Sequence, residues 1–529
     1  MTDPVASDPI VDAVAPGYRF EGTALELGGL MLDAERLADV PIRIPLGMLN
    51  RHGLVAGATG TGKTKTLQLL AEQLSANGVP VFAADIKGDL SGLSQPGEGG
   101  EKITARAASV GQTWTATGFP TELYTLGGQG TGVPIRVTMS AFGPMLLAKV
   151  LGLNDTQTSS LGLVFHYADQ AGLPLLDLAD LRAVVQYLVS DEGKPELKAL
   201  GGLSSATAGV ILRELIAFSD QGADEFFGEP EFESADLLRL TDDGRGVISL
   251  LELPNLQDRP ALFSTFLMWL LADLFHDLPE VGDVDKPKLV FFFDEAHLLF
   301  NDASDDFLDQ ITQTVRLIRS KGVGVFFVTQ SPTDVPDDVL AQLGSRVQHQ
   351  LRAHTPNDAK ALKATVNTYP TSAYDDLGAV LTTLGIGEAV VTVMDERGAP
   401  TPVAWTRLRA PESLMGPADP AATKAAVEAS PGWAKYATVQ DRESAREKLA
   451  ARLEEGSRKA EKETGQPRKQ ASRTRRRRTS ESSRSSRSEG NWADGGGMVG
   501  DVMGSPVFKD FMRTAAREIA RGMFKSGRR

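Results

Sequence analysis

Short apolar runs alternate with helical patterns along most of this 529-residue chain. The apolar runs have the length and hydrophobic character of buried strands, and they occupy residues 52–56, 79–85, 132–139, 246–251, 288–293 and 322–329. Apolar residues at helical spacing fill much of the remainder, as in residues 64–74, 140–240 and 305–321. Strands that alternate with helices predict an α/β fold with an open, mostly parallel sheet and a large helical insertion.

The same pattern divides the chain into four regions. We expect a lead-in at residues 1–45 with a small β element near residues 25–28, a core at residues 46–410 with its helical insertion at about residues 140–240, a charged helical stretch and low-complexity basic linker at residues 411–504, and a basic amphipathic helix at residues 505–529. Residues 466–488 predict disorder, because a segment with almost no apolar side chain cannot bury a core.

The predicted terminal helix has two distinct faces. Ser505 and Pro506 suit its N-cap and its first helical position. Apolar residues from Phe508 to Met523 share one face, and Lys and Arg residues at four-residue spacing form a stripe on another. The pattern leaves open whether this helix docks on the core or a neighbouring subunit, or contacts a nucleic acid or a membrane surface.

Composition narrows the classes of protein and site. The chain has no cysteine, which excludes disulfides and thiolate metal sites, and its six histidines lack paired ligand spacing, which predicts no bound zinc. The N-terminus lacks the pattern of a signal peptide. The most hydrophobic run, residues 261–275, is too short to span a bilayer and carries Asp273, so it predicts a buried helix. We therefore expect a cytoplasmic protein without stable membrane insertion.

Charge is distributed unevenly along the chain. Residues 431–529 contain 24 basic and 13 acidic side chains, whereas residues 1–430 contain 31 basic and 56 acidic ones. A strongly acidic body disfavours binding of a polyanion over its whole surface. Any contact with DNA is therefore expected at a local basic patch, a pore or the tail.

Residues 57–64 read Gly-Ala-Thr-Gly-Thr-Gly-Lys-Thr, a complete G-x-x-x-x-G-K-[ST] pattern between a predicted strand and a predicted helix. Such a loop wraps its backbone N–H groups around nucleotide phosphates, and the following helix N-terminus adds a favourable dipole. We expect Lys63 to reach the β- and γ-phosphates of ATP and the Thr64 hydroxyl to bind Mg²⁺. The predicted nucleotide-binding residues are Gly57, Ala58, Thr59, Gly60, Thr61, Gly62, Lys63, Thr64 and Lys65.

The apolar run at residues 289–293 ends in Asp294 and Glu295. Two carboxylates at the carboxyl end of a buried strand are costly unless a cation or a water uses them. We expect Asp294 to complete the magnesium shell and Glu295 to polarise the attacking water. Gln330, just beyond the next predicted strand, is expected near the γ-phosphate or its water. For Asp85, support of the metal or the water stays open against a cap or turn role.

An arginine commonly stabilises the transition state in ATPase rings, either in cis or from a neighbouring subunit. Four arginines are candidates for this role: Arg316 and Arg319 on the predicted helix at residues 305–321, and Arg346 and Arg352 after the predicted sheet. The sequence does not decide among them.

Four segments together, GATGTGKT, ADIKGD, LVFFFDEAH and FFVTQSP, resemble the HerA/FtsK group of P-loop ATPases. Residues 48–93 are similar to the bacterial HerA-like helicase subfamily, and the likeness extends over residues 20–410 and the terminal basic helix. The resemblance implies a RecA-like core, a homo-oligomeric ring that is often a hexamer, and ATP-driven DNA translocation in the better-known relatives. It also implies the roles given above for Lys63, Thr64, Asp294, Glu295 and Gln330.

The chain also departs from these relatives. Residues 1–45 are too few for the β-barrel that precedes the ATPase core of HerA, and the membrane helices and winged-helix domain of FtsK are not evident. The Asp-Glu-Ala-His string does not indicate a superfamily-2 helicase, because the Q-x-x-G-R-x-x-R motif of a second RecA domain is missing from the sequence.

We therefore predict a magnesium-dependent motor ATPase that acts on DNA. A nucleotide-dependent switch or assembly ATPase, which would act on protein partners without DNA, stays open as the alternative. A small-molecule kinase fits the Asp-Glu pair and the large helical insertion less well.

Overall fold

The computed structural model describes residues 8–128, 130–199, 201–253, 260–282, 284–300 and 305–464. The predicted disorder at residues 466–488 and the predicted terminal helix at residues 505–529 lie outside the described residues. Residues 1–461 form one compact unit, and a second unit begins at residue 462, within the last described helix. The elements below belong to the first unit.

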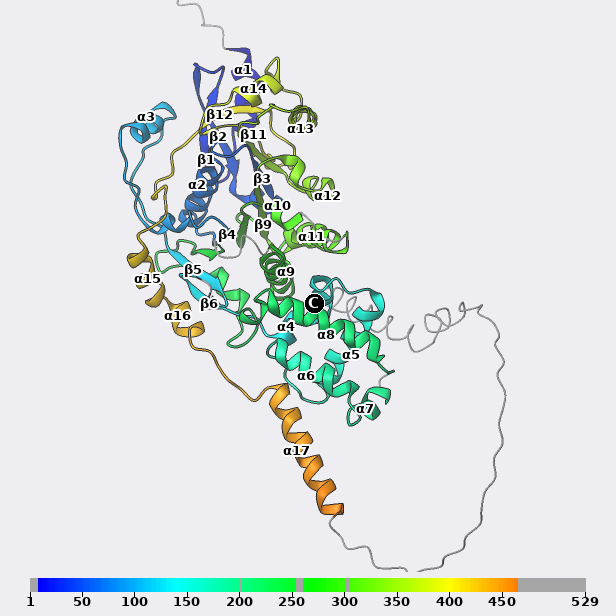
Figure 1. The fold of residues 1–529 in the computed structure, drawn as a ribbon. Coiled ribbons are helices and arrows are strands. Elements are labelled where there is room, and N and C mark those ends of the chain that lie inside the picture. Colours follow the sequence, from blue (N-terminus) through cyan, green and yellow to red (C-terminus); the bar gives the residue numbers. More distant parts are fainter. Residues whose placement is uncertain are drawn as a thin grey trace, which may run out of the picture. The chain divides into compact units, whose positions relative to one another are not determined.

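One twelve-stranded sheet organises the described part of the chain (Figure 1). Its spatial order is β2-β1-β12-β11-β10-β3-β9-β8-β4-β7-β5-β6. The strands are β1 (Ala24–Met31), β2 (Leu37–Pro45), β3 (Gly53–Ala56), β4 (Val81–Asp85), β5 (Thr121–Leu126), β6 (Val133–Ile135), β7 (Ile248–Glu252), β8 (Leu289–Phe293), β9 (Val323–Thr329), β10 (Ser345–Gln348), β11 (Glu388–Thr392) and β12 (Ala404–Leu408).

The sheet has a parallel part and an antiparallel wing. All pairs from β10 to β6 are parallel, which confirms the predicted mostly parallel α/β sheet. The strands β11, β12, β1 and β2 continue it in antiparallel fashion. The β element expected near residues 25–28 is larger than predicted and joins the main sheet. Gly28 permits this join, because a β-carbon there would lie 2.0 Å from the Arg407 carbonyl oxygen of β12.

Helices cover the sheet and form the insertion. They are α1 (Pro9–Val14), α2 (Lys63–Ala76), α3 (Glu101–Ser109), α4 (Met139–Val150), α5 (Asp155–Gln170), α6 (Leu178–Val189), α7 (Lys194–Ala199), α8 (Ser205–Asp220), α9 (Pro260–Asp277), α10 (His297–Phe300), α11 (Asp305–Ile318), α12 (Asp337–Leu340), α13 (Pro356–Asn367), α14 (Leu377–Thr383), α15 (Pro420–Glu428), α16 (Pro431–Tyr436) and α17 (Ala445–Thr464).

Local sequence explains where the insertion helices begin. Asn154, Asp177 and Ser204 each accept a hydrogen bond from the third backbone N–H of the helix that follows, which starts α5, α6 and α8. Helices α4 to α8 account for the helical pattern that the sequence predicts after residue 140. In the region where a charged helical stretch is expected, residues 411–504, the charged helix is α17. Among the described helices, none combines the length and apolar character needed to cross a membrane.

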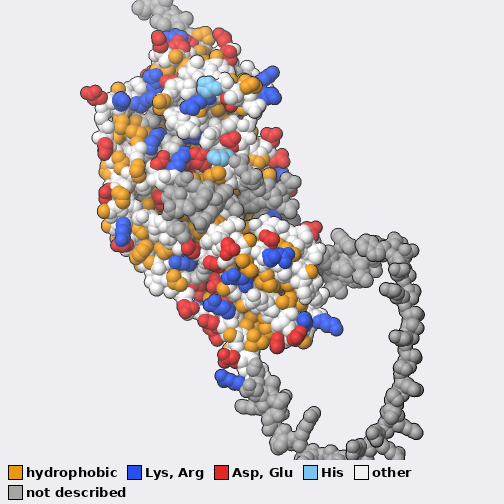
Figure 2. Space-filling view, viewed as in Figure 1, with side chains coloured by type: hydrophobic (Ala, Val, Ile, Leu, Met, Phe, Trp, Pro, Cys, Tyr) orange, Lys and Arg blue, Asp and Glu red, His pale blue; other side chains and the backbone are white. Residues whose placement is uncertain are grey.

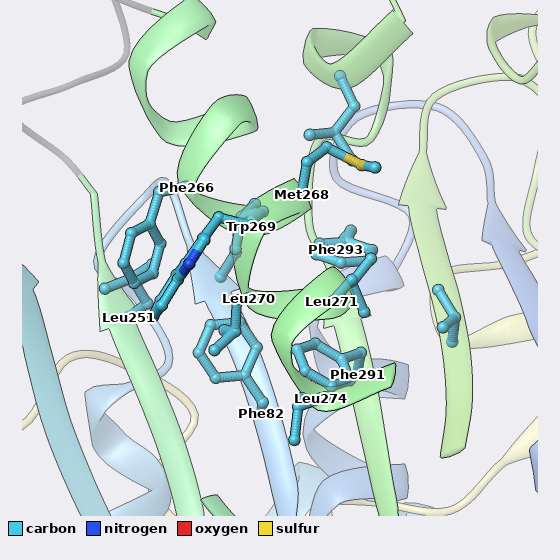
Figure 3. Close-up of a cluster of buried hydrophobic side chains, with 14 of the residues drawn as sticks. Phe82, Leu251, Phe266, Met268, Trp269, Leu270, Leu271, Leu274, Phe291 and Phe293 are labelled. Carbon is cyan, nitrogen blue, oxygen red and sulfur yellow. The ribbon is translucent and has the colours of Figure 1, made fainter. Parts of the chain in front are cut away.

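Helix α9 fills the core beneath the strands that carry the predicted carboxylates. Its side chains Trp269, Leu270, Leu271 and Leu274 lie against Phe82, Leu251, Phe291 and Phe293 from β4, β7 and β8 (Figure 3). The rings of Phe82 and Phe291 have centroids 4.9 Å apart. Burial of each such side chain stabilises the fold by roughly 1.5–3 kcal/mol. This packing confirms the predicted buried helix and holds the ends of β4, β7 and β8 level with one another.

Candidate functional site

The phosphate loop, residues 57–64, links β3 to α2 and depends on three glycines. Gly57, Gly60 and Gly62 have φ angles of 153°, 83° and 118°, values that other residues rarely adopt. A β-carbon at Gly57 would lie 2.5 Å from the β-carbon of His349, whereas one at Gly60 would meet nothing within 4 Å. The backbone conformation therefore shapes the loop, and its turn at Gly60 is open.

Backbone hydrogen bonds from neighbouring strands hold the phosphate loop. The Gly57 N–H donates to the Thr329 carbonyl at the end of β9 (3.2 Å), and the Ala58 N–H donates to the Gln350 carbonyl just beyond β10 (2.8 Å). His349 is fully buried behind the loop, and its Nε2 lies 2.8 Å from Thr66 Oγ1. Burial lowers the pKa of His349 to about 4, so this ring is neutral at pH 7. The sequence analysis assigned no role to His349.

The turn before β11 braces the other side of the loop. The Gly387 N–H donates to the Thr61 carbonyl (3.0 Å). The Arg106 guanidinium of α3 holds this turn by donating to the carbonyls of Ile386 (2.8 Å) and Gly387 (3.3 Å). Segments from three distant parts of the chain therefore fix the shape of the phosphate loop.

Lys63 lies folded over the loop that precedes it. Its side chain is 6% exposed, and Nζ donates to the carbonyls of Gly57 (2.7 Å) and Ala58 (3.2 Å). Burial lowers the pKa of Lys63, and the nearby charge of Glu295 opposes this shift. Lys65, one turn into α2, donates to Gln68 Oε1 (3.1 Å).

Asp294 and Glu295 follow β8, which is separated from β3 by β9 alone. Asp294 is 3% exposed, and its Oδ1 accepts the Glu295 N–H (2.9 Å) while its Oδ2 is buried and accepts no hydrogen bond. Burial raises the pKa of Asp294 to about 7. Glu295 has a φ of 47°, a left-handed conformation that costs of order 1–3 kcal/mol for a residue with a side chain.

A lysine lies against this carboxylate pair. Lys87 Nζ is 2.5 Å from Glu295 Oε1 and 4.0 Å from Asp294 Oδ2. Burial would raise the pKa of Glu295, but the hydrogen bond and charge of Lys87 outweigh it and lower the value. His297 Nδ1 is 3.3 Å from Glu295 Oε2. The ADIKGD strand end is recognisable in the sequence, but the role of Lys87 was not predicted, because the contact joins residues far apart in sequence.

The other predicted side chains lie at the same edge of the sheet. Gln330 is exposed and directly follows β9, between the phosphate loop and the carboxylate pair in strand order. Asp85 is fully buried at the end of β4, and its two oxygens accept the N–H groups of Gly88 (2.7 Å) and Leu90 (2.8 Å). These bonds give Asp85 a turn-forming role in the structure.

The four candidate arginines occupy different environments. Arg352 is exposed just beyond β10, and its Nη2 donates to the Thr59 carbonyl of the phosphate loop (3.2 Å). Arg346, within β10, donates to the Thr368 carbonyl (3.2 Å). Arg316 is exposed on α11, and Arg319 is half-buried in the short helical turn after it. The contact of Arg352 joins this arginine to the phosphate loop.

A magnesium nucleotide fits the residues at this edge. The glycine conformations expose the loop backbone, Lys63 lies over it, and Thr64 is the second residue of α2. Oδ2 of Asp294 is a buried carboxyl oxygen without a hydrogen-bond donor, and carboxylate oxygens are ligands that Mg²⁺ prefers. A strand, glycine loop and helix, with a carboxylate on the next strand but one, form a RecA-like P-loop core.

Comparisons with solved structures find several proteins that are similar to this chain. The bacterial conjugative coupling protein TrwBdeltaN70 is 17% identical over 76% of this chain and 92% of its own, with a TM-score of 0.49. TrwB in complex with ADP and Mg²⁺ is 18% identical over 76% and 99%, with a TM-score of 0.49. VirB4 of Thermoanaerobacter pseudethanolicus is 14% identical over 74% and 97%, with a TM-score of 0.48. A search of curated proteins finds no match.

The family comparison covers nearly the whole chain. The model described as "Helicase HerA-like C-terminal" matches residues 31–529. This agrees with the resemblance that the four sequence segments indicated. The chain belongs to the helicase HerA-like C-terminal family.

Proposed function

We propose that this protein is a magnesium-dependent ATPase that works as a ring-forming motor on DNA. The observation that carries the proposal is the meeting of a glycine-shaped phosphate loop and the Asp294–Glu295 pair at one edge of the sheet. Membership of a helicase-like family supports the motor function. In this proposal the ATPase core is residues 46–410.

Each side chain has a defined task in the proposed reaction. Lys63 would turn from the loop carbonyls to the β- and γ-phosphates, and Thr64 and Asp294 would hold the metal. Bound Mg²⁺ would neutralise charge on the phosphate oxygens. Glu295 would accept a hydrogen bond from the attacking water and orient its oxygen toward the γ-phosphorus as the bond to the ADP oxygen breaks. Gln330 would contact the same water or the γ-phosphate.

Two arginines are suited to the transition state in different ways. Arg352 contacts its own phosphate loop at Thr59, which supports a role in cis. Arg316 is exposed on α11, where it is accessible to a neighbouring subunit, and this supports a role in trans. In either position a guanidinium would stabilise charge that develops on the transferring phosphoryl group.

A second candidate function is a nucleotide-dependent switch that acts on protein partners. The acidic balance of residues 1–430, 31 basic against 56 acidic side chains, favours it. Among the described residues on the face shown in Figure 2, Lys and Arg side chains are interspersed with Asp and Glu and form no large basic patch. DNA binding would therefore depend on a ring interior or on the basic C-terminal region.

The test is the steady-state ATPase rate of the full chain, with and without double-stranded DNA, at low and physiological salt. We expect Lys63→Ala and Glu295→Gln to lower kcat by at least about a hundredfold, because each removes a group that acts on the reacting phosphate or water. Lys360→Ala, at an exposed position on α13, is the matched control.

The outcomes separate the candidate functions. Stimulation by DNA that is absent in Glu295→Gln supports a DNA motor. A rate that is independent of DNA supports the switch on protein partners. Unchanged turnover in Lys63→Ala would contradict the ATPase site itself.

A further inference from the structure

The turn that carries Lys87 is built rigidly from its own sequence. Asp85, fully buried at the end of β4, accepts the N–H groups of Gly88 (2.7 Å) and Leu90 (2.8 Å) and closes the turn. Gly88 has a φ of 73°, which a side chain would disfavour. Lys87 is exposed in this turn, so its backbone position is set by the two hydrogen bonds to Asp85 rather than by contacts of its own side chain.

The register of the sheet brings this turn to the carboxylate pair. β4 and β8 are adjacent and parallel, with Ala84 opposite Phe293, so the residues that follow them, Asp85 and Asp294, are level. Lys87 Nζ therefore reaches Glu295 Oε1 at 2.5 Å. The side chain of Lys87 is 38% exposed, whereas that of Glu295 is 11% exposed. The cation thus covers the carboxylate from the solvent side.

Glu295 needs such a partner. Glu295 has a left-handed backbone conformation and directly follows Asp294, whose side chain is 1% exposed. Two carboxyl groups therefore lie together where little water reaches them. Two neighbouring carboxylates repel each other when both are ionised, and a glutamate side chain without a partner can adopt several rotamers. The ion pair with Lys87 binds Oε1, while Oε2 is buried and accepts no hydrogen bond. His297 Nδ1, 3.3 Å away, is the other basic group beside that oxygen.

We propose that Lys87 is a positioning residue that fixes Glu295 through Oε1 and so keeps Oε2 available for the attacking water. This inference rests on the proposed ATPase function. In this proposal the ADIKGD strand end has a function of its own, separate from those of the phosphate loop and the Asp-Glu pair. The competing role, in which Lys87 instead binds the γ-phosphate as a second lysine, makes different predictions.

The first experiment measures thermal unfolding without nucleotide. Four full-length proteins are compared: wild type, Lys87→Met, Glu295→Gln and the double variant. Met keeps the aliphatic stem but removes the charge. We expect Lys87→Met to lower Tm in the wild-type background. The decrease in Tm should be much smaller in the Glu295→Gln background, because the neutral amide no longer pairs with the cation. Equal Tm losses in both backgrounds would contradict the pairing.

The second experiment separates positioning from phosphate binding. We expect Lys87→Met to lower kcat at least about tenfold while the Kd for a fluorescent ATP analogue stays within about threefold. Lys87→Arg should recover most of kcat. In the Glu295→Gln background, Lys87→Met should cause no further loss in single-turnover hydrolysis. Lys360→Met is the control for removal of a lysine elsewhere.

The results distinguish this inference from the function on which it rests. A weaker nucleotide affinity for Lys87→Met in the Glu295→Gln background would overturn positioning in favour of phosphate binding. If Glu295→Gln is inactive and Lys87→Met turns over like wild type, the positioning role alone is wrong. If Glu295→Gln hydrolyses ATP like wild type, both the role of Glu295 and the positioning role of Lys87 are wrong.

Discussion

At the scale of single residues, the carboxyl edge of the sheet brings buried carboxyl groups together. Asp85, Glu252 and Asp294 end or follow the adjacent strands β4, β7 and β8. Oε1 of Glu252 and Oδ2 of Asp294 are buried without hydrogen-bond partners. Such an arrangement costs stability, since ionised groups lose their hydration there. The proposed function uses the Asp294 carboxylate at this edge to hold a cation, so stability and the proposed function are opposed here.

The effect of a buried carboxyl group on stability can be measured at Glu252. Burial, and then Asp85 and Asp89, raise its pKa from 4.5 to about 8. The folded state therefore binds the proton more tightly than the unfolded chain, so this contribution to stability is complete below pH 4.5 and is lost as the pH rises to about 8. We expect Glu252→Gln to increase the free energy of unfolding by on the order of 1 to 3 kcal/mol at pH 8 and to leave it unchanged near pH 4.5.

Urea unfolding of both proteins at the two pH values checks this prediction. Glu280→Gln serves as the control, because Glu280 is exposed and its substitution removes the same charge from the surface. A gain that is equal at pH 4.5 and pH 8 would contradict the assignment to Glu252 titration.

Gly387 is a second position where the backbone conformation favours one residue type, glycine. Its φ is 72°, and a β-carbon there would lie 3.4 Å from Arg106 Nη2. Gly387→Ala should cost about 1 kcal/mol in stability and should shift the N–H that donates to Thr61 in the phosphate loop. We therefore expect weaker ATP binding, measured as Kd for a fluorescent analogue.

The matched control for this change is Gly398→Ala. Gly398 has a similar φ of 80° and lies in the turn between β11 and β12. It should lose similar stability without a change in nucleotide affinity. Equal effects of both variants on Kd would show that general strain, rather than the contact with the loop, is responsible.

At the scale of elements, the packing of α9 keeps the carboxyl ends of β4, β7 and β8 aligned. Leu270 is fully buried in the cluster that joins α9 to β4, β7 and β8 (Figure 3). Leu270→Ala should destabilise the protein by roughly 2–5 kcal/mol, through lost burial and the cavity left behind. Leu453→Ala, also in a helix but 42% exposed, should change the stability little. Guanidinium unfolding monitored by circular dichroism compares the two, and similar losses would contradict this role of α9.

Elements also show why sequence reasoning succeeded in some places and failed in others. The phosphate loop and the Asp294–Glu295 strand end are contiguous patterns, so the sequence predicted their place on a parallel sheet. The strands β2, β5, β10, β11 and β12 were not predicted. The pairing of β10 with β3 and of β12 with β1 depends on partners far away in sequence. The contacts of Lys87 and His349 were not predicted either, because they also join residues far apart in sequence. Local patterns specify the chemistry of this site, and long-range packing supplies the residues that hold it in position.

At the scale of the whole molecule, the proposed ring makes a prediction about the arginines. Lys63→Ala subunits would lack a working phosphate loop but would still present Arg316 to a neighbour. Arg316→Ala subunits would keep the loop but lack the arginine. If Arg316 acts in trans, mixing the two inactive variants should restore activity up to about a quarter of wild type, the share of interfaces that pair the two intact parts.

Arg352 provides the contrast in the same experiment. Because Arg352 donates to Thr59 of its own phosphate loop, no mixed interface would combine an intact Lys63 with an intact Arg352 in one subunit. A mixture of Arg352→Ala and Lys63→Ala should therefore stay inactive if Arg352 acts in cis. Recovery in the Arg352 mixture, or none in the Arg316 mixture, would reverse these two assignments. ATPase rates of equimolar mixtures after co-assembly with a non-hydrolysable ATP analogue, followed by exchange into ATP, decide between them.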